Sequence, residues 1–516
     1  MACHLEPHHH GNSKPNMTET LPRQRRLAFL RHRATLERPQ DWEGNAVFRE
    51  LPILELEYEG IEPPAFRWEN VDWSLRLLRE SRDCQDFVMI AILRMLCRYG
   101  SSRLLTAAHH AQLKHVLLGV KYWCDEPGKD TCCWSSENHQ VMYHTAELLA
   151  GQLWPDERFR NNGWVGRRHR EHAREMLYLW LDWRRKMSFC EWLSAHYYDD
   201  DIAVLLNLYD CAEDAALRRL AEQVLDELFF ELAVVQFQTG TPFAQGRAYE
   251  AEVLRPDATP ISALLKLVLG DMPVEAIPPT LSRSALVLCT SAYDPPPPVR
   301  RIAACRDVME CRHRHGVNVE DAHRFGIFPD RLRDYPFFLG AGCGNHHLCV
   351  ENGYILNNGD GYNYGFEYYR RCKAEGIEFD PDPHQYALTE ANLYVYKTPH
   401  YVLSCAQDYR KGKPASSSIS GRPGWAAIAW CSPRTPPAAR RTTGPGCGTV
   451  TASCLALCSS ATCSSPCTGW FRIPSTISRR GITTSMCTRI FRRPSSTMSA
   501  WRAGGCSAGG AVRSLG

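Results

Sequence analysis

The last 108 residues of this 516-residue chain contain no aspartate and no glutamate. All 57 acidic residues lie at or before Asp408, whereas 15 of the 60 lysines and arginines lie beyond it. The formal net charge of +3 is therefore the sum of an acidic body, which carries −12, and a basic tail. The arginines of the tail are scattered rather than clustered, which argues against a segment that binds nucleic acid.

Other missing features exclude further classes of protein. No run of eighteen apolar residues occurs, so we expect no membrane span. The first forty residues have no apolar signal-peptide core, and we therefore expect a cytoplasmic protein. No glycine-rich phosphate loop, dinucleotide-binding fingerprint or nucleophile elbow is found, which leaves nucleotide-dependent enzymes and serine hydrolases without support. The body holds an odd number of cysteines, 15, which favours reduced and mostly buried thiols.

The tail from about Lys413 is built mainly from Ser, Thr, Gly, Pro, Ala, Arg and Cys. Neither the period of two typical of strands nor the period near 3.6 typical of helices persists there. We predict that residues 413–516 are disordered and derive from a coding region translated out of frame. An alternative is a zinc or disulfide module formed by Cys454, Cys458, Cys463 and Cys467.

The composition and hydrophobic pattern of the acidic body change along its length. Residues 1–45 have the composition of a disordered leader, and residues 46–300 contain amphipathic helical stretches separated by short breaks. Short connections favour antiparallel helical hairpins packed side by side, and no repeat of fixed period is present. The predicted helices span residues 87–99, 106–123, 138–153, 167–186, 202–209, 215–235 and 261–269.

Residues 301–412 are predicted to complete the helical part and to begin a β domain. Asp294-Pro-Pro-Pro-Pro298 separates the two parts, and beyond Gly326 aromatic and β-branched residues alternate with turn signals. Asn-Gly and Asp-Gly within residues 353–361 predict a hairpin, and residues 392–404 predict further strand. The predicted fold class is therefore mainly α followed by β.

Three clusters of polar and aromatic residues are candidates for chemistry. The first, Trp134-Ser-Ser-Glu-Asn-His-Gln140, is predicted to open a helix with a serine at its N-cap. Glu137, Asn138 and His139 would then lie in the first turn, where the helix dipole favours an anionic ligand. Tyr143 would lie one turn further along the same face. The alternative is that these groups only cap the helix.

The second and third clusters lie further along the chain. Residues 189–201 lie between two predicted helices, and the alternative for them is a capping aspartate preceded by packed aromatic residues. In Ala244-Gln-Gly-Arg-Ala-Tyr249 the planar guanidinium of Arg247 can grip a carboxylate. Six of the ten body tryptophans fall within residues 134–192, and flat aromatic rings suit the apolar faces of sugars. The candidates in the second cluster are Glu191, Trp192, His196, Tyr197, Tyr198 and residues 199–201.

The order of helical hairpins followed by a sheet resembles a known family. An Asn-His pair at a helix start, with tyrosines 58 and 59 residues after His139, adds to the resemblance. The chain is similar in this respect to polysaccharide lyases of the heparinase II/III and alginate lyase type, over roughly residues 85–408. The resemblance implies an (α/α) toroid of antiparallel helical hairpins and a C-terminal antiparallel β-sandwich, which would be incomplete here. It also implies a polysaccharide or oligosaccharide substrate.

The resemblance further implies β-elimination across a uronic acid. Asn138 and His139 would neutralise the uronate carboxylate and stabilise the enolate-like charge that develops. Tyr197 or Tyr198 would move the proton, and a phenol needs a neighbouring cation such as Arg247 to act as a base near neutral pH. The residues expected to line the substrate are Trp134, Glu137, Tyr143, Trp192, His196 and Tyr249.

Two other functions remain open on the sequence. A glycoside hydrolase on the same scaffold would use two carboxylates, and Glu137, Glu191 and residues 199–201 are candidates for such a pair. A carbohydrate-binding or scaffold protein would use the same helices without catalysis. No cofactor is expected. A weaker prediction places Zn²⁺ at Cys343, His346, His347 and Cys349, although this spacing is not that of a standard zinc finger.

Overall fold

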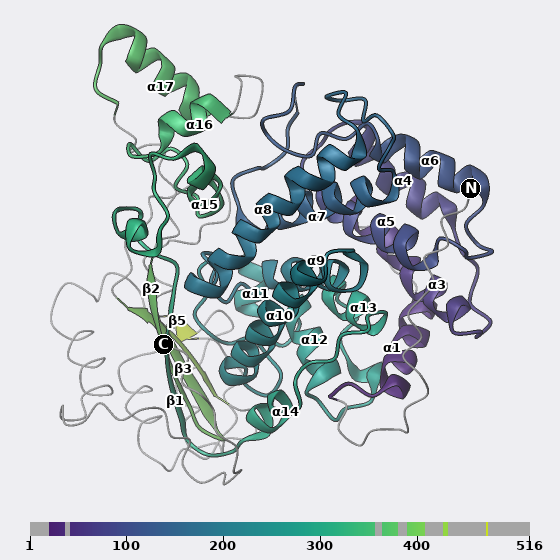
Figure 1. The fold of residues 1–516 in the computed structure, drawn as a ribbon. Coiled ribbons are helices and arrows are strands. Elements are labelled where there is room, and N and C mark those ends of the chain that lie inside the picture. Colours follow the sequence, from purple (N-terminus) through teal and green to yellow (C-terminus); the bar gives the residue numbers. More distant parts are fainter. Residues whose placement is uncertain are drawn as a thin grey trace, which may run out of the picture.

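The computed structural model describes residues 20–36, 42–128, 130–356, 364–379 and 390–407, and the backbone of residues 427–431 and 471–472. Within these residues the chain is mainly helical and ends in a small antiparallel sheet, which confirms the predicted order of helices first and strands second (Figure 1). Residues 1–19 lie outside the described residues. The remainder of the predicted tail also lies outside them, including the four cysteines considered as a zinc or disulfide module.

The helical part contains fourteen α-helices in the described residues, and all seven predicted helices are among them. The first seven are α1 (Arg23–Thr35), α2 (Glu43–Ala46), α3 (Leu51–Tyr58), α4 (Trp68–Arg79), α5 (Gln85–Tyr99), α6 (Ala107–Leu117) and α7 (Glu137–Leu153). The next seven are α8 (Gly166–Met187), α9 (Tyr197–Cys211), α10 (Ala215–Val235), α11 (Glu250–Leu254), α12 (Pro260–Val268), α13 (Arg283–Cys289) and α14 (Pro297–Ala304). Short 3₁₀ turns are η1 (Val47–Arg49), η2 (Val274–Ala276), η3 (Val319–Phe325) and η4 (Leu332–Asp334).

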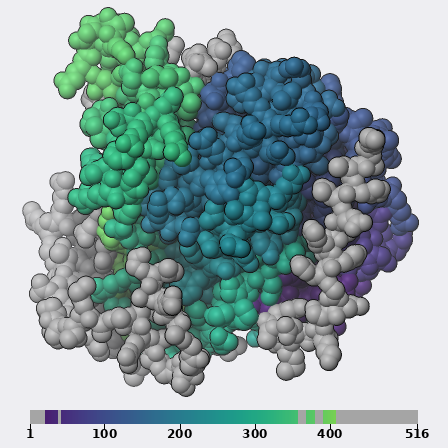
Figure 2. All heavy atoms as spheres, in the orientation of Figure 1, coloured from purple at the N-terminus to yellow at the C-terminus, as the bar shows by residue number. Residues whose placement is uncertain are grey.

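Burial separates the longer helices into an inner and an outer set. Helices α5, α7 and α9 are buried on all sides over residues 85–95, 137–151 and 197–208. They pack against one another, whereas α8 and α10 bury one face on them and expose the other. The blue region that includes α8 forms much of the surface in Figure 2. A helix buried on every side belongs to the interior, so α5, α7 and α9 form the core of the helical part.

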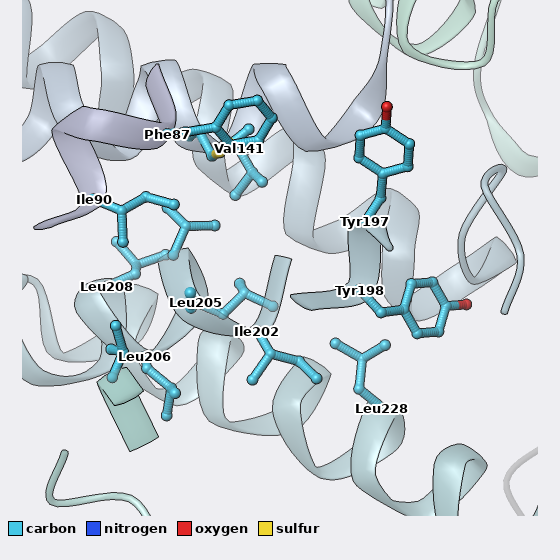
Figure 3. Close-up of a cluster of buried hydrophobic side chains, with 14 of the residues drawn as sticks. Phe87, Ile90, Val141, Tyr197, Tyr198, Ile202, Leu205, Leu206, Leu208 and Leu228 are labelled. Carbon is cyan, nitrogen blue, oxygen red and sulfur yellow. The ribbon is translucent and has the colours of Figure 1, made fainter. Parts of the chain in front are cut away.

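Apolar side chains from four helices meet in this core (Figure 3). Phe87 of α5, Val141 of α7, Ile202 of α9 and Leu228 of α10 are each at most 5% exposed. Burying a side chain of this size contributes about 1.5–3 kcal/mol each. The inner helices therefore hold a fixed position, and the polar residues at their ends are placed by this packing.

Residues 20–36 do not belong to a disordered leader, so the prediction for residues 1–45 is wrong in this segment. Phe29 and Leu30 of α1 are buried in the main core. Arg25 donates hydrogen bonds to three backbone carbonyls, in the last turn of α12 and in the loop after it. Arg26 donates to three backbone carbonyls, in the last turn of α13 and in the loop after it. The last carbonyls of a helix have no partner within it, so these arginines satisfy buried groups rather than facing water.

One antiparallel sheet follows the helices, with strand order β1-β2-β3-β4-β5. Val395 in its second strand lies opposite Cys311 and Ser404. The strands predicted within residues 392–404 are confirmed. The five strands are β1 (Met309–His315), β2 (Ala391–Lys397), β3 (Tyr401–Gln407), β4 (Ala427–Cys431) and β5 (Phe471–Arg472).

The hairpin predicted at residues 353–361 is wrong where the structure describes it. Residues 350–356 form helix α16 (Val350–Leu356), which packs between α15 (Tyr335–Gly340) and α17 (Tyr364–Glu375). The amide of Asn352 in α16 donates to the carbonyl of Pro329 at 2.8 Å. These tertiary contacts override the β propensity of the local aromatic and β-branched residues.

Two buried polar contacts fasten the sheet to the helical part. Lys397 of β2 donates to the carbonyls of Val234 and Gln236, at 2.7 and 3.1 Å, where α10 ends. Glu231 of α10 has its Oε1 atom 2.8 Å from Nδ1 of His313 and 2.5 Å from Nε2 of His315, both on β1. Helix α10 is therefore bonded to the two adjacent strands β1 and β2.

Candidate active site

The first two sequence clusters meet at the N-terminal ends of the inner helices. Asp86 in the first turn of α5 is hydrogen-bonded to His139 in the first turn of α7. Asp201, near the start of α9, interacts electrostatically with the same histidine. Three helix starts at one end of the core direct their positive dipole ends toward one region. Most of the polar residues predicted to be functional lie there.

His139 has two side-chain partners. Its Nδ1 lies 2.6 Å from Oδ2 of Asp86, and the ring also hydrogen-bonds the Cys133 side chain. Burial disfavours the charged imidazolium, but the neighbouring Asp86 and Cys133 outweigh burial and raise the pKa of His139 well above its usual value. Asp86 was missed in the sequence because it precedes His139 by 53 residues and no local pattern links them.

Cys133 was also missed, although it stands in the loop directly before α7. Its backbone N–H donates to Oδ1 of Asp83 at 2.8 Å, and its Sγ lies 3.5 Å from the hydroxyl oxygen of Ser135. Burial raises the thiol pKa, but His139 lowers it by more, so the pKa of Cys133 is below its usual value. A thiol with a depressed pKa beside a histidine is the arrangement of a reactive cysteine.

Asn138 presents a buried amide that is only half satisfied. Its Oδ1 accepts a hydrogen bond from the hydroxyl of Ser136, the residue at the N-cap of α7, which makes no capping bond itself. Its Nδ2 has no partner among the described residues. Leaving a buried donor unpaired costs about 1–3 kcal/mol. Such a donor is a position where a bound ligand would recover free energy.

Glu137 is held in a structural ion pair. It is 1% exposed and contacts the guanidinium of Arg184, which is also buried. Its two oxygens accept hydrogen bonds from the backbone N–H groups of Cys190 and Glu191, at 2.9 and 2.6 Å. Both of its oxygens are therefore engaged, with Cys190, Glu191 and Arg184, and it is not a free carboxylate for substrate.

The third sequence cluster joins the second through two tyrosines and an arginine. The hydroxyls of Tyr197 and Tyr249 are hydrogen-bonded to each other. The Arg247 guanidinium lies 3.8 Å from the centre of the Tyr197 ring and forms an ion pair with Glu191. Burial raises the pKa of Tyr197 well above its usual value. Tyr249 is 37% exposed, so it is the member of the pair that solvent reaches.

Tyr198 does not join this network, which separates the two tyrosines that the sequence left as alternatives. Its ring points away from that of Tyr197 (Figure 3). Its hydroxyl accepts from the backbone N–H of Leu193 at 3.0 Å and donates to Glu231 at 3.3 Å. Tyr198 is fully buried, and its contacts fix the start of α9 against α10.

The three aspartates of the second cluster have three different roles. Asp199 accepts from Ser282 Oγ and the Arg283 backbone N–H at the start of α13, at 2.7 and 2.8 Å. Asp200 forms an ion pair with the Arg283 side chain at 2.8 Å. Neither oxygen of Asp201 has a hydrogen-bond partner in the described chain. Burial and the charge of Glu191 raise the pKa of Asp201 well above its usual value, which favours the neutral form of this acid.

The remaining predicted substrate-binding residues fall into two groups. Trp134 and Tyr143 are buried with ring centres 4.3 Å apart, and these contacts belong to the core rather than to a surface that binds ligand. His196 has a 34% exposed side chain, hydrogen-bonds Glu252 and lies edge-on to Tyr249. Trp192 lies against Gly246, where a Cβ atom would be 2.6 Å from the indole ring.

Side chains that can hold a metal ion converge elsewhere in the described part of the chain. Each of the three convergent groups contains a glutamate and at least one histidine: His144, Glu147 and His172; Glu126, Glu147 and His169; Glu231, His313 and His315. None of them includes the predicted zinc ligands. The thiol of Cys349 instead contacts the carbonyl of Cys343 at 3.2 Å, and His346 accepts from the backbone N–H of Leu348.

Comparisons with family models, with curated proteins and with solved structures gave no match to this chain. Among the described residues, no helix has both the length and the apolar composition needed to cross a membrane. The class of protein must therefore be argued from the polar network itself.

Proposed function

We propose that this protein is carbohydrate-active and cleaves a uronate-containing glycan by β-elimination, in the manner of a polysaccharide lyase. The observation that carries the proposal is the combination of two groups at one end of the inner helices. One group, Asn138 and His139, is suited to a carboxylate, and the other, Tyr197 and Tyr249 beside Arg247, is suited to proton transfer.

Carboxylate recognition would fall to the start of α7. The free Nδ2 of Asn138 can donate to a carboxylate oxygen, and the cationic His139 and the helix dipole favour the same negative charge. Neutralising a uronate carboxylate makes the proton on the adjacent carbon easier to remove, because the charge that develops spreads onto the carboxylate oxygens.

Proton transfer would fall to the tyrosine pair. Tyr249 is the exposed member, and its hydrogen bond to Tyr197 gives the proton a path into the network. Arg247 stabilises negative charge on either phenol because its guanidinium lies against the Tyr197 ring. In the proposed reaction the pair takes the proton from the sugar, and the pair or His196 returns a proton to the leaving oxygen.

The carboxylates needed for a glycoside hydrolase are less well placed. Glu137 is paired with Arg184, and Glu191 is paired with Arg247. Asp201 and Glu191 interact electrostatically, but both side chains are fully buried; the lyase makes the same demand for opening at Asn138, which is 0% exposed. The hydrolase thus remains a measurable alternative that would require Glu191 and Asp201 to become exposed.

The fold adds a second line of support. The inner set α5, α7 and α9, with the outer set α8 and α10, is the arrangement that an (α/α) toroid would have. We propose this architecture for α3 to α14, and we propose that the sheet is the first part of a β-sandwich. The candidate site would then lie at the end of the toroid where polysaccharide lyases bind their substrates.

The test is a panel of uronate-containing and neutral glycans. Elimination produces a conjugated double bond that absorbs in the ultraviolet, and a parallel reducing-end assay detects cleavage of either kind. We expect absorbance with at least one uronate glycan and its loss in Asn138→Ala and Tyr249→Phe. Tyr354→Phe is the matched control, because Tyr354 is also 37% exposed but lies in α16. Reducing ends without absorbance would replace the lyase with the hydrolase.

A second candidate function rests on Cys133, His139 and Asp86. A thiol hydrogen-bonded to a histidine that a carboxylate orients is the arrangement used for acyl transfer through a thioester. In that case Cys133 would react with iodoacetamide faster than Cys84, whose pKa burial raises to about 12. Equal labelling of the two cysteines in the folded protein, measured by peptide mass spectrometry, would remove this candidate.

A further inference from the structure

Helices α7 and α8 carry two matching histidine-containing motifs that the proposed reaction does not use. His144 and Glu147 are three residues apart on α7, and His169 and His172 are three residues apart on α8. Residues at this spacing share one face of a helix. The two helices pack closely, since a Cβ atom at Gly151 of α7 would lie 2.6 Å from the carbonyl of Gly166 in α8. The two motifs therefore face each other.

The three histidines converge on the carboxylate of Glu147. The Nδ1 atom of His172 lies 3.0 Å from both of its oxygens, that of His169 2.8 Å from Oε1, and that of His144 3.5 Å from Oε2. The candidate ligand atoms of His144, Glu147 and His172 all lie within 4.8 Å of one another. A tetrahedral Zn²⁺ with ligands at about 2.1 Å keeps neighbouring ligand atoms about 3.4 Å apart, which these separations approach.

Two further carboxylates, those of Glu126 and Asp125, lie close to this cluster. Glu126 and Glu147 belong to the same convergent group, together with His169. Asp125 interacts electrostatically with His144 and His172. Glu147 and His144 are at most 1% exposed. Against the effect of burial, Glu147 raises the pKa of His172 to about 9, so without metal the buried carboxylate is paired with a proton on that ring, and a divalent cation would take the place of that proton.

His169 acts as an outer partner of this group. The N–H of Trp164 donates to Oδ1 of Asn162 at 3.0 Å, which identifies that atom as oxygen. Nε2 of His169 lies 3.2 Å from the same oxygen and must therefore carry a proton. The ring is held with its other edge toward Glu147, and partners of this kind orient the ligands of metal sites.

We propose that His144, Glu147 and His172 bind one divalent transition-metal ion, for which Zn²⁺ is the best chemical match. Two imidazoles and one carboxylate are a ligand set that zinc accepts, and such a set leaves a fourth position for water. The side chain of His172 is 24% exposed, so the ion has a route to solvent on that side. The ion would clamp the α7–α8 hairpin, whose first turn carries Asn138 and His139. The inference does not depend on the reaction proposed for that turn.

The experiment measures metal directly on the full chain. Purified protein is stripped with a chelator, titrated with Zn²⁺ against a chromogenic competitor, and analysed for bound metal by mass spectrometry. We expect one equivalent of Zn²⁺, an affinity that falls at least about 100-fold in Glu147→Gln and in His172→Gln, and a rise in Tm on zinc addition that both variants lose. His115→Gln is the matched control, because His115 is an exposed histidine on α6.

Three outcomes would overturn the proposal. A folded native chain that binds no Zn²⁺, Mn²⁺ or Fe²⁺ in the presence of the competitor would do so. Binding that both Glu147→Gln and His172→Gln retain would also overturn it. Binding lost instead in His313→Gln would assign the metal to the group around Glu231. Circular dichroism of each variant separates loss of the site from loss of the fold. Because the His172 side chain is partly exposed, His172→Gln is the substitution least expected to unfold the protein.

Discussion

Replacing Glu137 with glutamine should destabilise the protein strongly, although the change is nearly isosteric. Glu137 and Arg184 are 1% and 2% exposed and form a direct ion pair. Removing one member of a buried pair leaves the other charge uncompensated, which costs about 3–5 kcal/mol. The amide also has one acceptor oxygen where the carboxylate has two, so one of the N–H groups of Cys190 and Glu191 loses its partner. A loss of this size is a large part of a typical stability of about 5–15 kcal/mol.

The assay is guanidinium unfolding followed by tryptophan fluorescence. Trp180 donates to the carbonyl of Glu137 at 2.9 Å and therefore reports on this position. The double variant Glu137→Gln, Arg184→Met removes both charges and should recover most of the loss. Glu157→Gln is the control, because its partner Lys114 is on the surface and the change should stay within about 1 kcal/mol. A Glu137→Gln chain that loses less than about 1 kcal/mol, or a double variant worse than the single, would refute the structural role of Glu137.

Three further predictions use the same unfolding measurement. Gly246→Ala places a carbon 2.6 Å from the Trp192 ring and should cost about 1–3 kcal/mol; an unchanged midpoint would contradict this close approach. Burial lowers the pKa of Lys397 to about 8, so above that pH the unfolded chain binds more protons than the folded one. Stability relative to Lys397→Met should therefore rise from pH 8 to pH 10 by up to about 1.4 kcal/mol per unit, and a constant difference would exclude the shift. Arg26→Ala should cost about 2–4 kcal/mol and speed proteolysis before α3, whereas unchanged cleavage would show that α1 is held by other contacts.

Helices of both the inner and the outer set could be predicted from the sequence, but their side-chain partners could not. Residues 138–153 and 215–235 read as helices from their periodicity, and the structure has α7 and α10 within a residue of those bounds. The pairing of His139 with Asp86 depends on how α5 packs on α7, and no local pattern records it. The same holds for Arg247 and Tyr197, which were proposed to act together from chemistry alone and are brought into contact by a loop after α10.

The errors in the prediction have a common physical cause. The composition of residues 1–45 suggested a disordered leader, yet Arg25 and Arg26 donate to backbone carbonyls at the ends of α12 and α13. Turn-forming dipeptides near residue 358 suggested a hairpin, yet the residues before them form α16. In each case the deciding partner lies outside the local segment: beyond residue 260 for α1, and in α15, α17 and Pro329 for α16. The motif pair on α7 and α8 was missed in the sequence, because two residues on each helix form a metal-binding group only where the helices pack side by side.

The bonds between Glu231 and the first strand determine whether the helices can exist as a separate fragment. A chain ending before β1 would leave the Glu231 carboxylate without His313 and His315 in a buried position. It would also deprive the carbonyls at the end of α10 of the ammonium group of Lys397. The helical part therefore differs from the sheet in architecture, but we do not expect it to fold without the sheet. Attempts to express the helical part should keep β1 and β2 attached.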